Sequence, residues 1–383
     1  MMASRTALLL AAHVTLAAAF APIPTAPAKL VHGKAAANRG PRALSGLTMA
    51  MDRISRRQAS ALGGAAVAGA LWVPSASIPA NAATTTEKVA AVPLAPVEFG
   101  KIGGEMDCAK VLTGMWQLSG SHGYRPSKDK VVKSMKEQVE AGFTTFDLAD
   151  HYGPAEQMTA LFKKQHPELW AKSQFFTKWV PMPGDMSRKV VEAAIDTRLQ
   201  RMGTDRLDML QFHWWDYGSR AQYMEALGHM QDMVTEGKIR HLALTNFDTE
   251  NLKAIKDAGI KVVSNQVQYS VLDKRPAALM GPYCEKNDVK ILAYGTVLGG
   301  FLSDKYVGKA LDEKDFDTVS KRKYYNMIRQ WGSWELFQEL LAEMKSVADK
   351  HQARAPRRAK APSPHSTLIS VRQPHATLVS DVR

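Results

Sequence analysis

Short apolar or β-branched segments alternate with amphipathic segments from residue 108 onward, and this alternation narrows the possible folds more than any other property of the chain. The apolar segments are VLTGMW, FTTFDLA, FFTKWV, LDMLQFHW, IRHLALTNF, KVVSNQVQY and VKILAYG, separated by amphipathic stretches such as MSRKVVEAAIDTRLQRMG. Glycines stand where the intervening helices would end, at Gly142, Gly203, Gly237 and Gly259. Strands that alternate with helices predict a parallel sheet covered by helices.

The number of these units favours one kind of parallel sheet. Seven strand–helix units over about 250 residues favour a closed (β/α)8 TIM barrel, an α/β fold, over an open doubly wound sheet. No G-x-G-x-x-G motif follows an early strand, as it would in a doubly wound dinucleotide-binding domain. We therefore expect a barrel over residues 95–351 whose eighth β/α unit is incomplete.

The net charge of +13 is concentrated at the two ends of the chain. Residues 1–85 carry eight Lys or Arg and one acid, and residues 352–383 carry six and one. Residues 86–351 carry 36 basic and 35 acidic side chains, so the body of the chain is nearly neutral. This balance argues against a basic face for nucleic acid, and we expect no such partner.

The first 83 residues have the composition of targeting signals. Residues 1–20 contain Arg5 and a short apolar run, as in a signal peptide. The following AAAFAP resembles the cleavage motif of plastid-targeted proteins in algae with secondary plastids, and residues 21–50, which lack acids, fit a transit peptide. Residues 51–83 contain the twin arginines Arg56 and Arg57 before an apolar stretch and ANA, and resemble a thylakoid twin-arginine signal.

These signals predict a location in a plastid. The thylakoid lumen is the expected destination, with the stroma as the alternative, and the processed chain would begin near Ala83 without stable membrane insertion. An Ala-rich leader of no particular destination is the simpler interpretation of the same residues.

The two cysteines, Cys108 and Cys284, fall in no C-x-x-C pair or other metal-like spacing. Two buried thiols are the simplest interpretation. A single disulfide between them is the alternative, because the sequence does not show whether the two cysteines pair. We expect no metal site.

Polar side chains stand at the end of each predicted strand. They are Trp116, Asp147, Lys178, His213, Asn246, Gln266 and Tyr294. Each alone has an ordinary structural explanation, since a lysine after a strand is usually solvated and an aspartate often caps the next helix. In a barrel, however, all of these strand ends converge on one face, where barrel enzymes hold their catalytic residues.

Four of the converging residues suit one kind of chemistry. Asp147, Tyr152, Lys178 and His213 form no set of metal ligands and include no nucleophile with an adjacent base. They offer a phenol of pKa about 10 beside an ammonium that would lower this pKa, with a carboxylate to hold the ammonium. Such a group suits carbonyl reduction, in which hydride adds to carbon and a proton reaches oxygen. The hydride must come from a cofactor.

The segments FTTFDLADHYGPAE, FFTKWV, LQRMGTDRLDMLQFHWWD, VTEGKIRHLALTNF, VVSNQVQYSVLD and ILAYGTVLGGFLSDKY resemble the successive signatures of the aldo-keto reductase family, from about Val111 to His351. The resemblance implies reduction of an aldehyde or ketone with NADPH, with NADH not excluded. Tyr152 would be the general acid, Lys178 and Asp147 its pKa-lowering pair, and His213 the group that orients the carbonyl. The cofactor-binding residues implied are Thr245, Asn246, Gln266 and Tyr294, and Trp116 would line the substrate pocket.

Two departures from the family pattern bear on the cofactor. Gly295 and Thr296 replace the usual Ser-Pro after the stacking tyrosine. After His351 the family continues to an eighth strand and a loop that holds the adenosine phosphate, whereas residues 352–383 read as a basic, disordered tail in which STLISV or ATLVS could form a makeshift strand. We expect an open barrel edge and weak cofactor binding, unless arginines of the tail take over the phosphate.

Two other functions are compatible with this reading. Potassium-channel beta subunits resemble the family and bind nucleotide with little turnover, so a redox-sensing or scaffold protein is the first alternative. A phosphate-binding barrel lyase or isomerase is the second alternative. This chain lacks the Gly-rich loop that such an enzyme would carry after its last strands. The complete four-residue site favours a reductase with a small carbonyl substrate. The sequence does not predict the oligomeric state of the protein.

Overall fold

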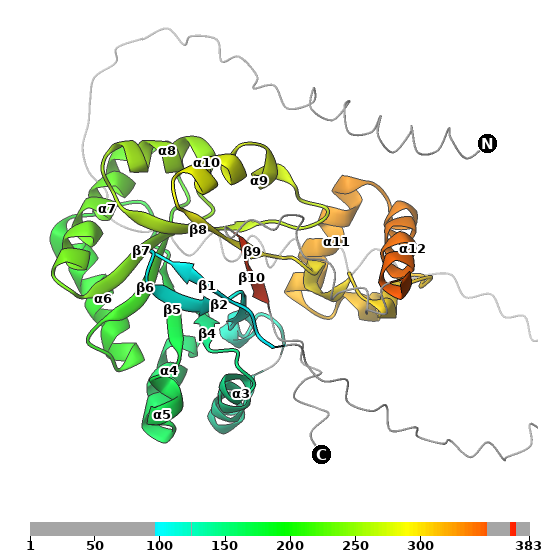
Figure 1. Ribbon diagram of the computed structural model, residues 1–383, viewed down its shortest axis with the longest axis horizontal. Coiled ribbons are helices and arrows are strands. Elements are labelled where there is room, and N and C mark those ends of the chain that lie inside the picture. Colours follow the sequence, from blue (N-terminus) through cyan, green and yellow to red (C-terminus); the bar gives the residue numbers. More distant parts are fainter. Residues whose placement is uncertain (1–95, 124, 351–367, 373–383) are drawn as a thin grey trace, which may run out of the picture. The chain divides into compact units, whose positions relative to one another are not determined.

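The computed structural model describes residues 96–123, 125–350 and 368–372. Eight parallel strands form a closed barrel in the order β10-β3-β4-β5-β6-β7-β8-β9 (Figure 1). Their bounds are β3 Val111–Gly114, β4 Thr145–Asp147, β5 Gln174–Trp179, β6 Leu207–His213, β7 Ile239–Thr245, β8 Val262–Gln268, β9 Lys290–Tyr294 and β10 Leu368–Arg372. The predicted TIM-barrel class is confirmed.

Helices surround the barrel between successive strands (Figure 1). They are α3 Lys128–Glu140, α4 Ala155–Gln165, α5 Pro167–Trp170, α6 Arg188–Met202, α7 Arg220–Thr235, α8 Thr249–Asp257, α9 Arg275–Ala278 and α10 Met280–Lys286. The four glycines expected at helix ends follow α3, α6, α7 and α8 and all have positive φ, from 63° to 91°. Gly203 caps α6 in the left-handed conformation that glycine adopts at little cost.

The eighth strand corrects our expectation for the end of the chain. β10 pairs with β9 through Ile369 and Leu292 and with β3 through Val371 and Leu112. The barrel therefore does not end at His351, and the predicted open edge is wrong, because LISVR, which overlaps the STLISV segment, pairs on both sides. A strand bonded to two neighbours leaves no open edge at this point of the sheet. The other residues of the predicted tail lie outside the described part of the chain.

An antiparallel hairpin, β1 Phe99–Ile102 and β2 Met106–Ala109, precedes the barrel and was not predicted. Ile102, Met106 and Cys108 pack with barrel-interior side chains such as Phe176 and Met209. An ion pair of 3.0 Å joins Glu105 in the hairpin turn to Arg240 near the start of β7. The hairpin therefore packs against the amino-terminal end of the barrel, opposite the strand ends that carry the predicted site residues.

A further pair of helices follows β9, α11 Val319–Trp331 and α12 Trp334–Lys350, and lies to one side of the barrel (Figure 1). Short 3-10 turns lead into it, η3 Leu298–Gly300, η4 Asp304–Tyr306 and η5 Glu313–Phe316. Its buried side chains form a cluster of their own, which includes Phe301, Tyr324 and Phe337. This insertion places new side chains beside the carboxyl end of β9.

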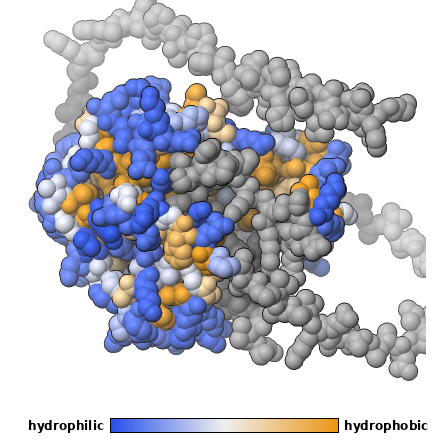
Figure 2. Space-filling model, viewed as in Figure 1, coloured by the Kyte–Doolittle hydropathy of each residue, from blue (hydrophilic) through white to orange (hydrophobic). Residues whose placement is uncertain are grey.

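Several predictions fall outside the barrel or concern its thiols. The three targeting segments within residues 1–83 lie outside the described residues and stay predictions. Cys108 and Cys284 are buried and unpaired, and burial raises the pKa of each thiol to about 12. In the described ranges, no helix has the length and apolar character needed to span a membrane. The surface in Figure 2 is mainly hydrophilic, with hydrophobic residues scattered over it.

Candidate active site

The polar residues predicted at the strand ends do meet at the carboxyl-terminal end of the barrel. The strand register pairs Gly114 with Asp147, Lys178 with Gln211, and Thr245 with both His213 and Gln266. The side chains therefore follow one another around the barrel at similar heights. This convergence is a consequence of parallel strands in register.

The centre of the site is a buried ion pair between Asp147 and Lys178, each 2% exposed. The ammonium of Lys178 donates to Asp147 Oδ1 at 2.8 Å, to Oδ2 at 2.7 Å and to the carbonyl of Leu148 at 2.9 Å. Gln211 and Gln266 also donate to Asp147 Oδ1, at 2.8 and 2.7 Å. Because every donor and both carboxylate oxygens have partners, the pair is held in one geometry despite its burial.

Tyr152 lies directly against this pair, with the Lys178 ammonium 4.9 Å from its ring centre. Burial, followed by the negative charges of Asp147 and Asp150, raises the pKa of Tyr152 well above its usual value. We expected Lys178 to lower this pKa, whereas the structure gives the opposite direction. The reason is that Asp147 neutralises the ammonium, so desolvation of the phenolate dominates. Tyr152 is therefore a neutral phenol that retains its proton.

His213 is also neutral over the physiological range. Burial, then the positive charge of Lys178, lowers its pKa to about 4. Its Nε2 lies 3.3 Å from the side-chain nitrogen of Asn246. The centre of its ring lies 4.4 Å from the ring centre of Trp215, which is 58% exposed at the mouth of the barrel. An uncharged imidazole in this place can form a hydrogen bond with a carbonyl oxygen without introducing a second cation.

The proposed cofactor residues form a group beside His213. Asn246 has a left-handed φ of 61°, and its side-chain oxygen accepts a bond of 3.0 Å from the Tyr294 hydroxyl. The hydroxyl of Thr245 is buried and has no hydrogen-bond partner among the described residues, which is unusual for a buried polar group. The side-chain nitrogen of Gln266 donates to Asp147 and to Gln211. Thr245, Asn246 and Tyr294 stay the predicted residues for a nicotinamide, and Gln266 also supports Asp147.

The loop after β9 explains one departure from the family pattern. A Cβ atom at Gly295 would lie 2.5 Å from the hydroxyl of Tyr324, and Gly295 has a φ of +74°. The neighbouring Lys323 places its ammonium 4.9 Å from the ring centre of Tyr294. Glycine replaces the expected serine because α11 fills the space that a side chain would need.

Trp116 begins the turn after β3, η2 Trp116–Ser119. Its ring contacts that of Tyr152, with ring centres 5.0 Å apart. Its place in a substrate pocket stays a prediction. Sequence reasoning missed Gln211, although it stands two residues before His213 and therefore on the same face of β6. A polar residue at alternate positions of a buried strand was the available signal.

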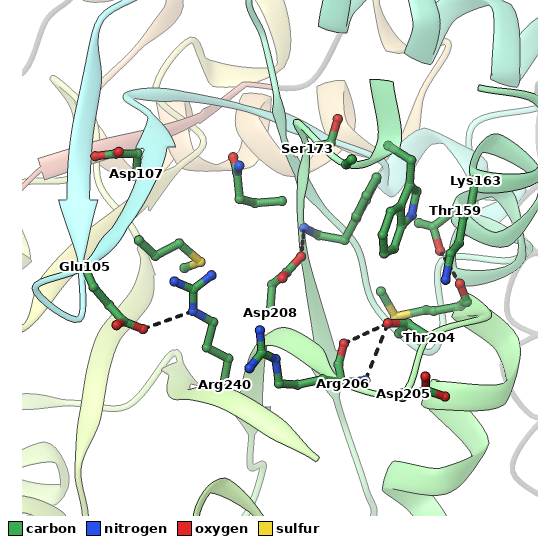
Figure 3. A pocket seen from close by; sticks show the side chains of 16 residues that line it. Glu105, Asp107, Thr159, Lys163, Ser173, Thr204, Asp205, Arg206, Asp208 and Arg240 are labelled. Carbon is green, nitrogen blue, oxygen red and sulfur yellow. Dashed lines mark hydrogen bonds and ion pairs between the residues drawn. The ribbon is translucent and has the colours of Figure 1, made fainter. Parts of the chain in front are cut away.

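A separate cavity of about 580 Å³ lies at the opposite end of the barrel (Figure 3). It is lined by charged residues near the strand beginnings, among them Glu105, Arg206, Asp208 and Arg240. Asp208 accepts a bond from the amide of Phe175 at 2.9 Å, and Glu105 pairs with Arg240. These contacts join the hairpin and the strands, as is typical of the stabilising end of a barrel. None of the predicted site residues lines this cavity.

No group of three or more His, Cys, Asp or Glu suited to a metal ion is found in the part of the chain that the structure describes. The site therefore consists of a buried ion pair, a neutral phenol, a neutral imidazole and an amide, with a mouth flanked by Trp116 and Trp215. Such a set can donate a proton to a substrate oxygen and stabilise charge on it.

Comparisons with known proteins agree with this geometry. The model of the Aldo/keto reductase family matches residues 110–359. The radial spoke protein 5 of Chlamydomonas reinhardtii flagella is 34% identical over 164 residues, which cover 38% of this chain and 31% of that protein. The aldo-keto reductase YhdN of Bacillus subtilis is 21% identical, over 57% of this chain and 66% of YhdN. The chain thus spans about a third of the first relative and just under two thirds of the second.

Solved structures share the fold at low sequence identity. An aldo/keto reductase from Klebsiella pneumoniae, crystallised with NADP and acetate, superposes with a TM-score of 0.53 at 17% identity. The match covers 74% of this chain and 88% of that protein.

Proposed function

Because the chain belongs to the aldo/keto reductase family, we propose that it reduces an aldehyde or ketone to an alcohol, with NADPH as the hydride donor and Tyr152 as the proton donor. The observation that carries the proposal is the buried Lys178–Asp147 pair beneath a protonated Tyr152. A purely structural ion pair has no need of a phenol and a neutral imidazole beside it at the mouth of the barrel.

The bound cofactor would supply the hydride that reaches the carbonyl carbon. The residues of the chain act on the oxygen. His213, kept neutral by burial, orients the carbonyl by a hydrogen bond, and Tyr152 transfers its phenolic proton to the oxygen as negative charge develops there. The nearby Lys178 ammonium then stabilises the phenolate, so the ion pair assists during proton transfer and not by ionising Tyr152 beforehand.

We propose that Thr245, Asn246 and Tyr294 hold the nicotinamide. The unpartnered Thr245 hydroxyl and the partly exposed ring of Tyr294 support this assignment. NADPH is preferred in the proposal because related structures were solved with NADP and NADPH. A comparison of NADPH with NADH by quenching of tryptophan fluorescence would test the preference.

Tyr152→Phe tests the chemical role. Since the change removes only the proton donor, we expect kcat for a generic aldehyde such as 4-nitrobenzaldehyde to fall at least about 100-fold. The NADPH dissociation constant should stay within about twofold of the wild type. Tyr283→Phe, on α10, serves as a control with the same loss of a hydroxyl. Undiminished turnover by Tyr152→Phe would contradict the proposal.

A nucleotide-binding scaffold protein is the alternative, and the similarity to a flagellar radial spoke protein is the observation that favours it. A scaffold would bind NADPH with little turnover. Measurement of NADPH affinity and of turnover across a panel of aldehydes and ketones separates the two functions. Tight binding without reduction of any carbonyl would favour the scaffold.

A further inference from the structure

A buried arginine that the proposed mechanism does not use lies beneath the site. Arg198, on α6, is 4% exposed and forms an ion pair with Asp150, in the loop after β4. It also donates to the carbonyl of Ala194 at 2.6 Å and to that of Lys178 at 3.4 Å. A buried charge is destabilising unless partners surround it, and the carboxylates of Asp150 and of the buried Glu156, 4.0 Å away, offset the burial of this arginine.

Asp150 connects the arginine to the mouth of the site. Its Oδ2 accepts from the amide of Val180 at 3.0 Å and from Arg198, while Oδ1 lies 2.9 Å from Nδ1 of His151. The backbone amide of Asp150 also donates to the carbonyl of Lys178. The loop that carries Tyr152 is thereby fixed to the end of β5, and the orientation of the His151 ring is fixed with it.

His151 stands at the rim of the proposed substrate pocket. Its ring centre lies 4.8 Å from that of Tyr152 and 5.8 Å from that of Trp116. Its side chain is 47% exposed. Among the described residues only Nδ1 has a hydrogen-bond partner, so Nε2 is available to a molecule bound beside Tyr152.

We propose that His151 is a specificity-determining residue that binds a second oxygen of the substrate, so that the enzyme prefers carbonyl compounds with a hydroxyl or oxo group on the adjacent carbon. Tyr152 and His213 serve the reacting oxygen. The aspartate-held imidazole offers Nε2, which can donate or accept a hydrogen bond, to a neighbouring oxygen. Apolar contact with Trp116 alone would favour plain aldehydes equally well, and it gives no reason for the chain of contacts from Arg198.

The inference rests on the proposed reductase function, and its test uses two substrates with the same carbon skeleton. The ratio of kcat/KM for 2-hydroxypropanal to that for propanal is measured in the wild-type chain and in variants. We expect a ratio of at least about ten in the wild type, since a site that hydrogen-bonds a substrate hydroxyl discriminates against the analogue without it. His151→Phe, which keeps the ring contacts, should reduce the ratio about tenfold.

Variants of Arg198 and His122 complete the test. Arg198→Met should lower the ratio as well, because His151 loses its support, and Arg198→Lys should restore part of it. His122 is the matched control: its ring also contacts Trp116, at 5.7 Å, but its Nε2 bonds Ser320 and no carboxylate holds it. His122→Phe should change both substrates by the same factor and leave the ratio unchanged.

Two results would overturn the inference. One is a ratio that His151→Phe leaves unchanged while propanal is still reduced, which preserves the proposed function. The other uses no turnover: equal affinities of the wild type for 2-hydroxypropanoate and propanoate, titrated by tryptophan fluorescence, would overturn it, since we expect the two acids to differ in affinity in the wild type and not in His151→Phe. If no carbonyl is reduced at all, the reductase function is wrong, and this acid pair still decides the role of His151.

Discussion

Lys178→Met tests whether the ion pair at the centre of the site is a major source of stability as well as of chemistry. The substitution removes an ammonium that is 2% exposed and three hydrogen bonds of 2.7 to 2.9 Å. It leaves the Asp147 carboxylate buried with two amide donors, Gln211 and Gln266. Methionine has nearly the same length, so little packing is lost.

The expected loss follows from the uncompensated charge. Removal of one partner of a buried ion pair destabilises a protein by about 3–5 kcal/mol. The two remaining amide donors offset part of this, so we expect the lower end, about 3 kcal/mol. For a domain of this size that corresponds to roughly 6–12 °C in Tm.

Urea unfolding followed by tryptophan fluorescence measures the change. Lys345→Met is the matched control, because its ammonium bonds Asp349 at 2.8 Å with both side chains exposed. We expect that control to lose less than about 0.5 kcal/mol. A double-mutant cycle with Asp147→Asn should show a coupling of at least about 2 kcal/mol. A loss below about 1 kcal/mol for Lys178→Met, or strict additivity in the cycle, would refute the reasoning.

Three further outcomes are expected. The pKa of His213 is about 4 in the folded chain and 6.5 in its usual state, so the unfolded state binds the proton first as the pH falls. The free energy of unfolding should therefore fall between pH 6.5 and pH 4, and urea unfolding of His213→Asn should show less of this fall. The serine side chain of Gly295→Ser would clash with Tyr324, so this variant should lose at least about 2 kcal/mol more free energy of unfolding than Gly308→Ser. Gly308 has a similar φ of +69° and open space around it, so equal losses would exclude the clash. Val371→Pro removes an N–H donor from a strand paired on both sides and should lower the free energy of unfolding by about 3 kcal/mol or more. Thermal unfolding measures the change, and the same Tm as for Val371→Thr would mean that β10 does not close the barrel.

The sequence by itself determined the barrel class and most of the site. Alternating apolar and amphipathic segments and the glycines at helix ends are local signals: the first reflects which face of each element is buried, and the second reflects a backbone conformation that favours glycine. The placement of Asp147, Lys178 and His213 in one site followed from the rule that parallel strands present their carboxyl ends on one face, so no contact had to be known in advance.

Tertiary structure alone decided which distant groups surround these residues. Closure of the barrel by Leu368–Arg372 depends on pairing with β3 and β9, and the local pattern of LISVR did not separate it from ATLVS. Asp150 acquires its partner Arg198 from a helix 48 positions along the chain. Tyr324 determines that residue 295 is a glycine.

The pKa of Tyr152 shows most clearly why the sequence alone could not predict these effects. The sequence predicted that the ammonium of Lys178, held by Asp147, would lower this pKa. It rises, because the fold buries the phenol and gives the lysine its own carboxylate. Electrostatic effects depend on burial and on the separation of every charge in three dimensions, and a pattern of residue types along the chain specifies neither.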